Sequence, residues 1–416
     1  MKTILRVLSL FTCLIQCLSI DENAFPYIFP NVPPIKDLVN SGFEEDGLLD
    51  FIGLTKKYGY TSEEHEIITK DGYILTVFRI PRRKACNHSE PPDPVVMMHG
   101  LLKSSDTFVT PGVGLAYTLA DSCYDVWCAN VRGNRYSREH VKWDPDKDKE
   151  FWQFSFHEHG TIDLATTVDY VLNETKSEKV SFIGHSQGTT SFFVLTSSRP
   201  DYNRKIKVAI CLSPVAYLNH IGNPVLKIFS RFNDEIKYLL DAFNIHEVFG
   251  KQLLPSRLLE VACQYIPDLC SAVRYIFFLQ RTDSTTHTRL KIIAGHVPAG
   301  TSAQNLHHFS QNIKADFFRR YDAGVNKNLE NYGQQEPPDY DLSKVAAPVV
   351  LICSNDDAIA TPQDVERLRD ELPNVLDMFT LRDPHWGHLD FTDGNDIPLE
   401  LAPKVLEYLM VTRDDR

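Results

Sequence analysis

A serine flanked by two glycines is the feature of this sequence that points most directly to chemistry. Residues 184–188 read Gly-His-Ser-Gln-Gly, and within residues 179–195 an apolar, strand-like run precedes them and a helix-compatible run follows them. Small residues on both sides of Ser186 allow a sharp turn from strand to helix, which leaves the hydroxyl exposed at the N-terminus of the helix. This context predicts that Ser186 is a nucleophile and not an ordinary turn serine.

A serine hydroxyl is a weak nucleophile unless a base takes its proton, and the base needs an acid that orients it. Where the nucleophile lies on a strand-to-helix turn, the acid and then the base follow it along the chain. One late apolar strand runs into Asp356 and Asp357, and the next strand is followed by His385 and His388. The acid is therefore Asp356 or Asp357 and the base His385 or His388, and the spacing alone decides neither pair.

The tetrahedral intermediate of acyl transfer also needs two backbone N–H donors for its oxyanion. The residue after the nucleophile, Gln187, is expected to supply one, and the loop after an early strand is expected to supply the other. In that loop Gly100 allows a close approach and Leu101 is the candidate donor. His99 precedes the glycine at the strand end, so we expect it to orient the loop and not to act as a base.

The composition excludes several other classes of protein. Hydrophobic residues make up 43% and charged residues 24% of the chain, which is typical of a globular protein and not of a disordered or polytopic membrane chain. The formal charge of −12 repels phosphate backbones, so nucleic acid is not an expected partner. The sequence also lacks the common metal-binding and nucleotide-binding motifs, and we therefore expect neither a metal nor a cofactor.

The elements that must position these residues alternate between strands and helices. A hairpin is expected where Asp71-Gly72 separates two β-prone runs. Later strands are predicted within residues 94–100, 124–134, 179–184, 207–216, 348–358 and 375–383, and helices before 124, over 161–172, after Ser186, over 364–374 and from Leu401 onward. This alternation predicts an α/β fold with a mostly parallel sheet that helices cover on both faces.

Residues 217–340 interrupt this alternation, and we predict that they form a helical cap between two parts of the core, residues 20–216 and 341–416. Eight apolar residues in this segment share one helical face: Val225, Ile228, Phe229, Phe232, Ile236, Leu239, Leu240 and Phe243. The first expectation is that this face packs inside the cap. The alternative is that part of it lines an acyl channel or meets a lipid surface.

The N-terminus has the features of an export signal. Lys2 and Arg6 form a basic start, an apolar run follows over residues 7–18, and small residues precede a cut after Ser19. The run is too short to cross a bilayer, which needs about 20 residues. We predict a signal peptide over residues 1–19 and an exported chain without a transmembrane segment.

The cysteines and two sequons fit this location in part. Seven cysteines remain after the signal peptide, and Cys128, Cys211 and Cys353 lie in apolar runs typical of buried free thiols. Cys263 and Cys270 form the expected disulfide, because Pro267 between them would break a straight helix and let the two approach. Asn87 and Asn173 begin N-glycosylation sequons.

Eight stretches along the mature chain resemble the acid lipases, the family of gastric and lysosomal lipases and their insect relatives. They are EEHEIITKDGYILTVFRIP (63–81), MMHGLLKSS (97–105), YDVWCANVRGNRYSREH (124–140), EFWQFSFHEHGTIDL (150–164), GHSQGTT (184–190), PAGTSAQN (298–305), ATPQDV (360–365) and HLDF (388–391). They follow the order of the family over nearly the whole mature chain. The resemblance implies an α/β-hydrolase fold with a helical cap over the site.

The resemblance also implies roles for individual residues. Ser186 would be the nucleophile, and Leu101 and Gln187 would be the oxyanion donors. The base would be His388, which begins HLDF, and the acid would be Asp357, three residues before the alanine of the ATPQDV stretch. The family's cap disulfide falls on Cys263 and Cys270. Two residues depart from the family pattern: Ala358 stands where a bulky residue is usual, and Gly387 where asparagine is common.

These features together predict a serine lipase that hydrolyses triacylglycerols or sterol esters at a lipid–water interface through an acyl-enzyme. The alternatives are an esterase for shorter or soluble esters and a lipid-binding protein without catalysis. A monomer is expected. The expected location is extracellular, with the lysosome as the alternative.

Overall fold

The structure is a computed structural model, and it describes residues 35–40, 42–83, 85–86, 93–250, 262–263, 265–279, 285–382 and 386–414. The expected signal peptide, Asn87 and His385 lie outside the described residues. Among the described residues, no helix is long and apolar enough to cross a membrane.

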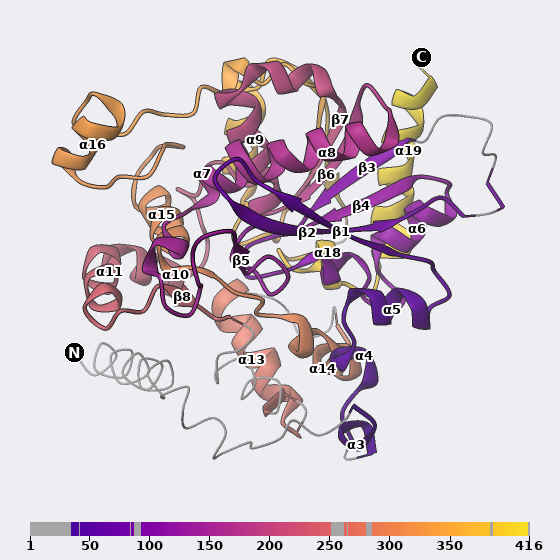
Figure 1. The fold of residues 1–416 in the computed structure, drawn as a ribbon. Helices are drawn as coiled ribbons and strands as arrows, with labels where there is room; N and C mark the ends of the chain where they lie inside the picture. The colour runs from indigo at the N-terminus through magenta and orange to yellow at the C-terminus, as the bar shows by residue number, and fades with distance from the viewer. Residues whose placement is uncertain are drawn as a thin grey trace.

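A nine-stranded sheet forms the centre of the molecule (Figure 1). Its strands lie in the order β1-β2-β4-β3-β6-β7-β10-β11, and β5 pairs with β2. The strands are β1 (Glu63–Ile68), β2 (Tyr73–Ile80), β3 (Pro94–Met98), β4 (Asp125–Ala129), β5 (Glu139–His140), β6 (Val180–His185), β7 (Ile206–Leu212), β10 (Val349–Ser354) and β11 (Val375–Leu381). Two short strands, β8 (Glu247–Val248) and β9 (Thr301–Ser302), form a separate antiparallel pair.

The six strands from β4 to β11 run parallel, and the predicted hairpin β1–β2 adds two antiparallel strands at one edge. The register aligns the carboxyl ends of the parallel strands. Met98 pairs with Gly184, and Leu212 pairs with both His185 and Ile352. The loops that follow β3, β6, β7 and β10 therefore leave the sheet at the same edge, which is where ligands bind in open parallel sheets.

Some helices cover the two faces of the sheet, and others lie away from it (Figure 1). The α-helices are α3 (Ile35–Asn40), α4 (Glu45–Leu48), α5 (Phe51–Lys57), α6 (Leu115–Asp121), α7 (Phe156–Glu158), α8 (Ala165–Thr175), α9 (Gln187–Ser198), α10 (Pro224–Arg231), α11 (Asn233–Ala242), α13 (Pro267–Phe278), α14 (His287–His296), α15 (Ala303–Lys314), α16 (Val325–Tyr332), α17 (Pro362–Glu371), α18 (Asp390–Asp393) and α19 (Ala402–Asp414). Short 3₁₀ or π turns are η2 (Ser105–Phe108), η3 (Lys149–Trp152), η4 (His159–Leu164), η5 (Pro200–Lys205), η6 (Leu342–Lys344) and η7 (Ile397–Leu401). The α/β architecture expected from the sequence is confirmed.

Each face of the sheet has its own apolar core. On β3, Val96 and Met98 face the layer of α8, α9 and α17, whereas Val95 and Met97 face the layer of α5, α6 and α19. All four side chains are fully buried. This burial on both faces explains why β3 is a continuous apolar run, since successive side chains of a strand point to opposite faces.

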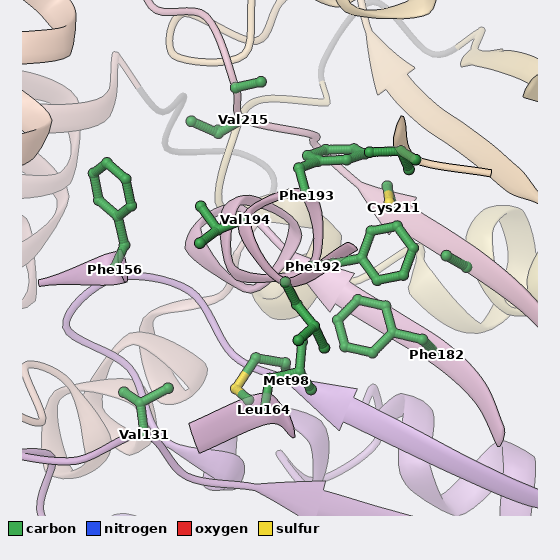
Figure 2. Close-up of a cluster of buried hydrophobic side chains, with 14 of the residues drawn as sticks. Met98, Val131, Phe156, Leu164, Phe182, Phe192, Phe193, Val194, Cys211 and Val215 are labelled. Atoms are coloured by element: carbon green, nitrogen blue, oxygen red, sulfur yellow. The ribbon is translucent and has the colours of Figure 1, made fainter. Parts of the chain in front are cut away.

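The helix after Ser186 lies deep in the first of these cores. Its residues are buried from Gln187 to Ser197. Figure 2 shows Phe192, Phe193 and Val194 pointing away from α9 in different directions, and the ring of Phe192 stacks on that of Phe182 with centroids 5.0 Å apart. Buried hydroxyl groups on α9 donate to backbone carbonyls: Thr196 donates to Phe192 one turn earlier, and Thr190 donates to Val215 after β7.

Helices α10, α11 and α13, which we call the cap helices, lie away from the sheet layers (Figure 1). The predicted helical face is divided between α10 and α11, which meet at Phe232. The expectation that this face packs inside the cap is wrong for four of its residues, because Ile228, Phe232, Leu239 and Phe243 are 44%, 45%, 38% and 60% exposed. The division of the chain at residues 217 and 340 stays a prediction.

Two disulfides occur among the described residues. Cys263 and Cys270 are bonded, with Cα atoms 5.4 Å apart, and α13 begins at Pro267 between them. A second bridge, which was not predicted, joins Cys86 to Cys123, 37 residues apart. Cys128, Cys211 and Cys353 are free and buried, as predicted.

Candidate active site

Ser186 lies on a tight turn between β6 and α9. Its backbone has φ 53° and ψ −118°, which is unfavourable for a residue with a side chain. The flanking glycines leave the room that this turn needs. A Cβ on Gly188 would lie 2.3 Å from the carbonyl oxygen of Met98, and one on Gly184 would lie 2.9 Å from the backbone of Gly188. The turn therefore requires glycine at both positions, as the sequence predicted.

The hydroxyl of Ser186 contacts one of the candidate bases. Its Oγ is 2.8 Å from Nε2 of His388, and Nδ1 of the same ring is 3.0 Å from each carboxylate oxygen of Asp357. The exposed fractions of Ser186, His388 and Asp357 are 9%, 3% and 3%. Three residues from three different loops thus form one hydrogen-bonded chain, which is the arrangement that lets an imidazole take a proton from a serine.

The neighbouring aspartate points elsewhere. Asp356 is exposed, whereas Asp357 turns inward and accepts from the backbone N–H groups of Ile359 and Ala360, both at 2.9 Å. These two bonds hold the carboxylate Oδ1 in place for His388. Of the two candidate acids, the structure brings Asp357 to the histidine.

Of the two expected oxyanion donors, Gln187 follows the nucleophile directly, and Leu101 follows Gly100, which packs against the turn. Gln187 is the first residue of α9, so its N–H lies at the free N-terminus of a buried helix. Gly100 packs against the turn, since a Cβ there would be 3.3 Å from Cβ of Ser186, and Leu101 follows it directly. Asn305 fixes Gln187 further by donating from Nδ2 to its Oε1 at 2.7 Å. Asn305 is a site residue that was not predicted, although it lies in the PAGTSAQN stretch.

Comparison with known proteins shows the family of the chain. The sequence profile of the alpha/beta hydrolase fold matches residues 93–395, and that of a partial alpha/beta-hydrolase lipase region matches residues 52–112. The chain belongs to the α/β-hydrolase family. It is 37% identical to Lipase 1 of Drosophila melanogaster over 90% of this chain and 83% of that protein. It is also 37% identical to gastric triacylglycerol lipase of Mus musculus over 84% of this chain and 88% of that protein.

These relatives place the chain among the lipases of the α/β-hydrolase family, so the family resemblance read from the sequence is confirmed. A solved structure of a soluble variant of monoglyceride lipase from Saccharomyces cerevisiae is similar in fold, with a TM-score of 0.54 at 15% identity. The similarity covers 85% of this chain and 95% of that chain. At 15% identity the structural similarity shows a shared fold only.

Two further histidines near the site of this α/β-hydrolase are structural. Burial lowers the pKa of His99 to about 4, so the ring is neutral at neutral pH. Its Nδ1 donates to the carbonyl of Gly100 and its Nε2 accepts from Asn134, which fixes the loop before Leu101. Burial also lowers the pKa of His185 well below its usual value, and its Nε2 donates to the backbone oxygen of His388 at 3.0 Å. The orienting role expected for His99 agrees with these contacts.

A buried ion cluster joins the site to the cap. Lys103, two residues after Leu101, places its Nζ 2.8 Å from Oδ1 of Asp393, and Arg274 of α13 approaches Oδ2 of the same carboxylate at 3.3 Å. Although burial alone would raise it, Lys103 and Arg274 hold the pKa of Asp393 below its usual range. One turn further along α13, the ring of Phe278 lies parallel to that of His388 with centroids 6.5 Å apart. This cluster could not be predicted from the sequence, because its members are far apart in the chain.

The second sequon is accessible at its asparagine. Asn173 is exposed in the last turn of α8, whereas Thr175 is buried and donates from its hydroxyl to the carbonyl of Val171. Glycosylation at Asn87 and Asn173 stays a prediction.

Proposed function

We propose that this protein is a serine lipase that hydrolyses the carboxylic ester bonds of neutral lipids, triacylglycerols or sterol esters. The observation that carries the proposal is the contact of 2.8 Å between Ser186 Oγ and His388 Nε2, continued by Asp357 on the far side of the ring. The relationship to lipases over most of the chain supports the substrate class.

Hydrolysis would take place in two halves. As Oγ of Ser186 attacks the ester carbonyl, His388 takes the proton of that hydroxyl. The oxyanion that forms accepts hydrogen bonds from the N–H groups of Gln187 and Leu101. When the intermediate collapses, His388 returns the proton to the departing alcohol and the acyl group stays on Ser186. Water then attacks the acyl-enzyme, again losing its proton to His388, and the fatty acid leaves as Ser186 regains its proton. Asp357 holds the ring in the tautomer that both halves need.

The substrate would reach the site at a lipid–water interface. The cap helices expose Ile228, Phe232 and Phe243, and α13 brings Phe278 next to His388. A long acyl chain gains roughly 0.8 kcal/mol for each methylene that it buries, so an apolar approach to the serine favours long chains over acetate. We further propose a monomeric protein that is exported through a signal peptide at residues 1–19, to the extracellular space or alternatively to the lysosome.

A chain-length series of esters tests this proposal. The purified protein is offered emulsified long-chain triacylglycerol, a sterol ester and an acetate ester in the presence of bile salt, with Ser186→Ala as the blank. We expect long-chain turnover to exceed acetate turnover. Hydrolysis of the acetate ester without long-chain activity would favour the alternative of an esterase. No turnover of any ester would favour the alternative of a lipid-binding protein without catalysis.

A further inference from the structure

Ser213 is a buried serine that contacts two members of the triad. Neither its place in the sequence nor the residues around it predict a catalytic role. It follows the last residue of β7, and its backbone N–H donates to the carbonyl of Ile352 on β10 at 2.8 Å. Its side chain is fully buried. The aligned strand ends place it at the same edge of the sheet as Ser186.

The backbone of Ser213 adopts a conformation that favours glycine. Its φ is 49°, in the left-handed region where a Cβ meets steric resistance. Glycine would occupy this position without that cost. If the residue served only to end β7, glycine would be more stable here than serine. Backbone strain near a reaction centre therefore points to a role for the side chain itself.

The hydroxyl of Ser213 lies between the acid and the base. It donates to Oδ2 of Asp357, because an ionised carboxylate can only accept, and its one proton is thereby used. Its oxygen is 2.7 Å from Nδ1 of His388, closer than either carboxylate oxygen at 3.0 Å. A lone pair of the serine thus faces Nδ1, and only a ring that carries its proton on Nδ1 satisfies this contact.

We propose that Ser213 is a positioning residue of the catalytic centre, which holds the proton of His388 on Nδ1 and the carboxylate of Asp357 in line with it. This inference rests on the proposed hydrolysis. With Nδ1 protonated, Nε2 presents its lone pair to Ser186, as general-base catalysis requires. Ser213 fixes Oδ2 of Asp357 while the N–H groups of Ile359 and Ala360 fix Oδ1, so both oxygens of the carboxylate are held.

Two substitutions separate this role from a role in folding. Ser213→Ala removes the hydroxyl and keeps the backbone strain, whereas Ser213→Gly removes both. Loss of a hydrogen bond to a charged group is expected to lower kcat about 10- to 100-fold in both variants, with KM nearly unchanged. The melting temperature of Ser213→Gly should equal or exceed that of the native protein. The matched control is Ser181→Ala on the neighbouring strand β6, which removes a buried hydroxyl that has no hydrogen-bond partner among the described residues.

The readout is kcat and KM on one ester, the melting temperature, and the proton NMR signal of Nδ1–H, whose chemical shift should change when its closest acceptor is removed. Native kcat in Ser213→Gly would overturn the proposal, because the hydroxyl would then be dispensable. A second outcome would also overturn the proposal: Ser213→Ala lowers kcat, but Ser213→Gly has native kcat and a native melting temperature. Ser213 would then have a role in folding only. Failure of the proposed function would look different, since the native protein itself would then hydrolyse no ester.

Discussion

The edge of the sheet that carries the triad and the cap helices use their side chains in opposite ways. At the sheet edge, Ser186, Asp357 and His388 are all less than a tenth exposed, and each is hydrogen-bonded to another residue of the centre. On the cap helices, Phe232 and Phe243 are 45% and 60% exposed although they are large and apolar. The triad is buried and held in a fixed geometry. The cap helices leave apolar surface in water, where a lipid can bind it.

This difference decides how each region should respond to substitution. A buried centre loses its function when one atom moves, because the attack needs reacting atoms about 3–3.5 Å apart in the right direction. An exposed apolar surface acts through its total area, so that each residue contributes a small share. Large effects on rate are therefore expected at the sheet edge, and small effects that depend on the substrate are expected on the cap.

The largest effect is expected at the nucleophile and the base. Ser186→Ala or His388→Ala should lower kcat on any ester by about 10⁶-fold, since loss of either residue stops the attack. Folding should be unaffected, as measured by circular dichroism. His385→Ala is the control and should leave the rate largely unchanged. Equal losses at the two histidines would contradict the assignment of His388 as the base.

The acid comes next. Asp357→Asn should lower kcat by about 10⁴-fold, because an amide next to Nδ1 favours the wrong tautomer of His388. Asp356→Asn is its matched control, since that side chain is exposed and lies one residue away. Activity lost in the control and kept in Asp357→Asn would mean that the loop after β10 is displaced by one residue.

Much of this arrangement could be predicted from the sequence, because the signals are local. The apolar run of β6, the glycines around Ser186 and the helix after it lie within residues 179–195, and the turn they predict is the one found. The central strands β3, β4, β6 and β10 are recognisable for a similar reason, since burial on both faces makes each of them a short apolar run. The spacing left Asp356 and Asp357 undecided, because an exposed loop allows either one to turn inward.

Other parts could not be predicted, because they depend on contacts between distant residues. Ser213 reaches Asp357 and His388 only after β7 and β10 pair, and Lys103 meets Asp393 from the opposite end of the chain. No spacing rule connects Cys86 with Cys123. The exposure of Phe232 was also missed, since an apolar helical face is ordinarily expected to be covered.

Buried histidines should make the core sensitive to acid. Burial lowers the pKa of His99 to about 4 and that of His308 to about 3, and it lowers the pKa values of His159 and His185 well below the usual range. The unfolded chain binds protons at these residues below about pH 6.5, whereas the folded protein does not, so stability is full above that pH and falls toward pH 4. Each such histidine contributes a slope of about 1.4 kcal/mol per pH unit.

Urea unfolding between pH 7 and pH 4 measures this slope. His308→Gln keeps a donor and an acceptor for Ser155 and Arg319 but cannot titrate, so its stability should fall less steeply with acid. His287→Gln is the control, because it makes the same replacement at a histidine whose side chain is 66% exposed. Identical slopes in the two variants would show that His308 is not protonated differently in the folded and unfolded chains. Asp106 does not mask the effect, since its pKa is lowered to about 2 and its contribution is lost only below about pH 4.

The smallest effect is expected on the cap. Replacing Phe232 and Phe243 together by serine removes two exposed rings that would enter a lipid surface, where partial burial of each is worth on the order of 1 kcal/mol. Turnover of emulsified long-chain triacylglycerol should therefore fall several-fold at low lipid concentration and recover as lipid is added. Turnover of a dissolved acetate ester should not change, because both rings are exposed on the cap whereas the triad is buried.

Leu376→Ser is the matched control for this variant. Leu376 is 51% exposed, as the cap phenylalanines are, but it lies on β11 at the far edge of the sheet. Since the control loses one exposed apolar side chain elsewhere, it should bind emulsified lipid as the native protein does. An equal loss in both proteins would mean that exposed apolar area acts without regard to place. A loss on the dissolved ester as well would show that the cap supports the triad directly, and the contrast between a fixed centre and an accessible cap would then fail.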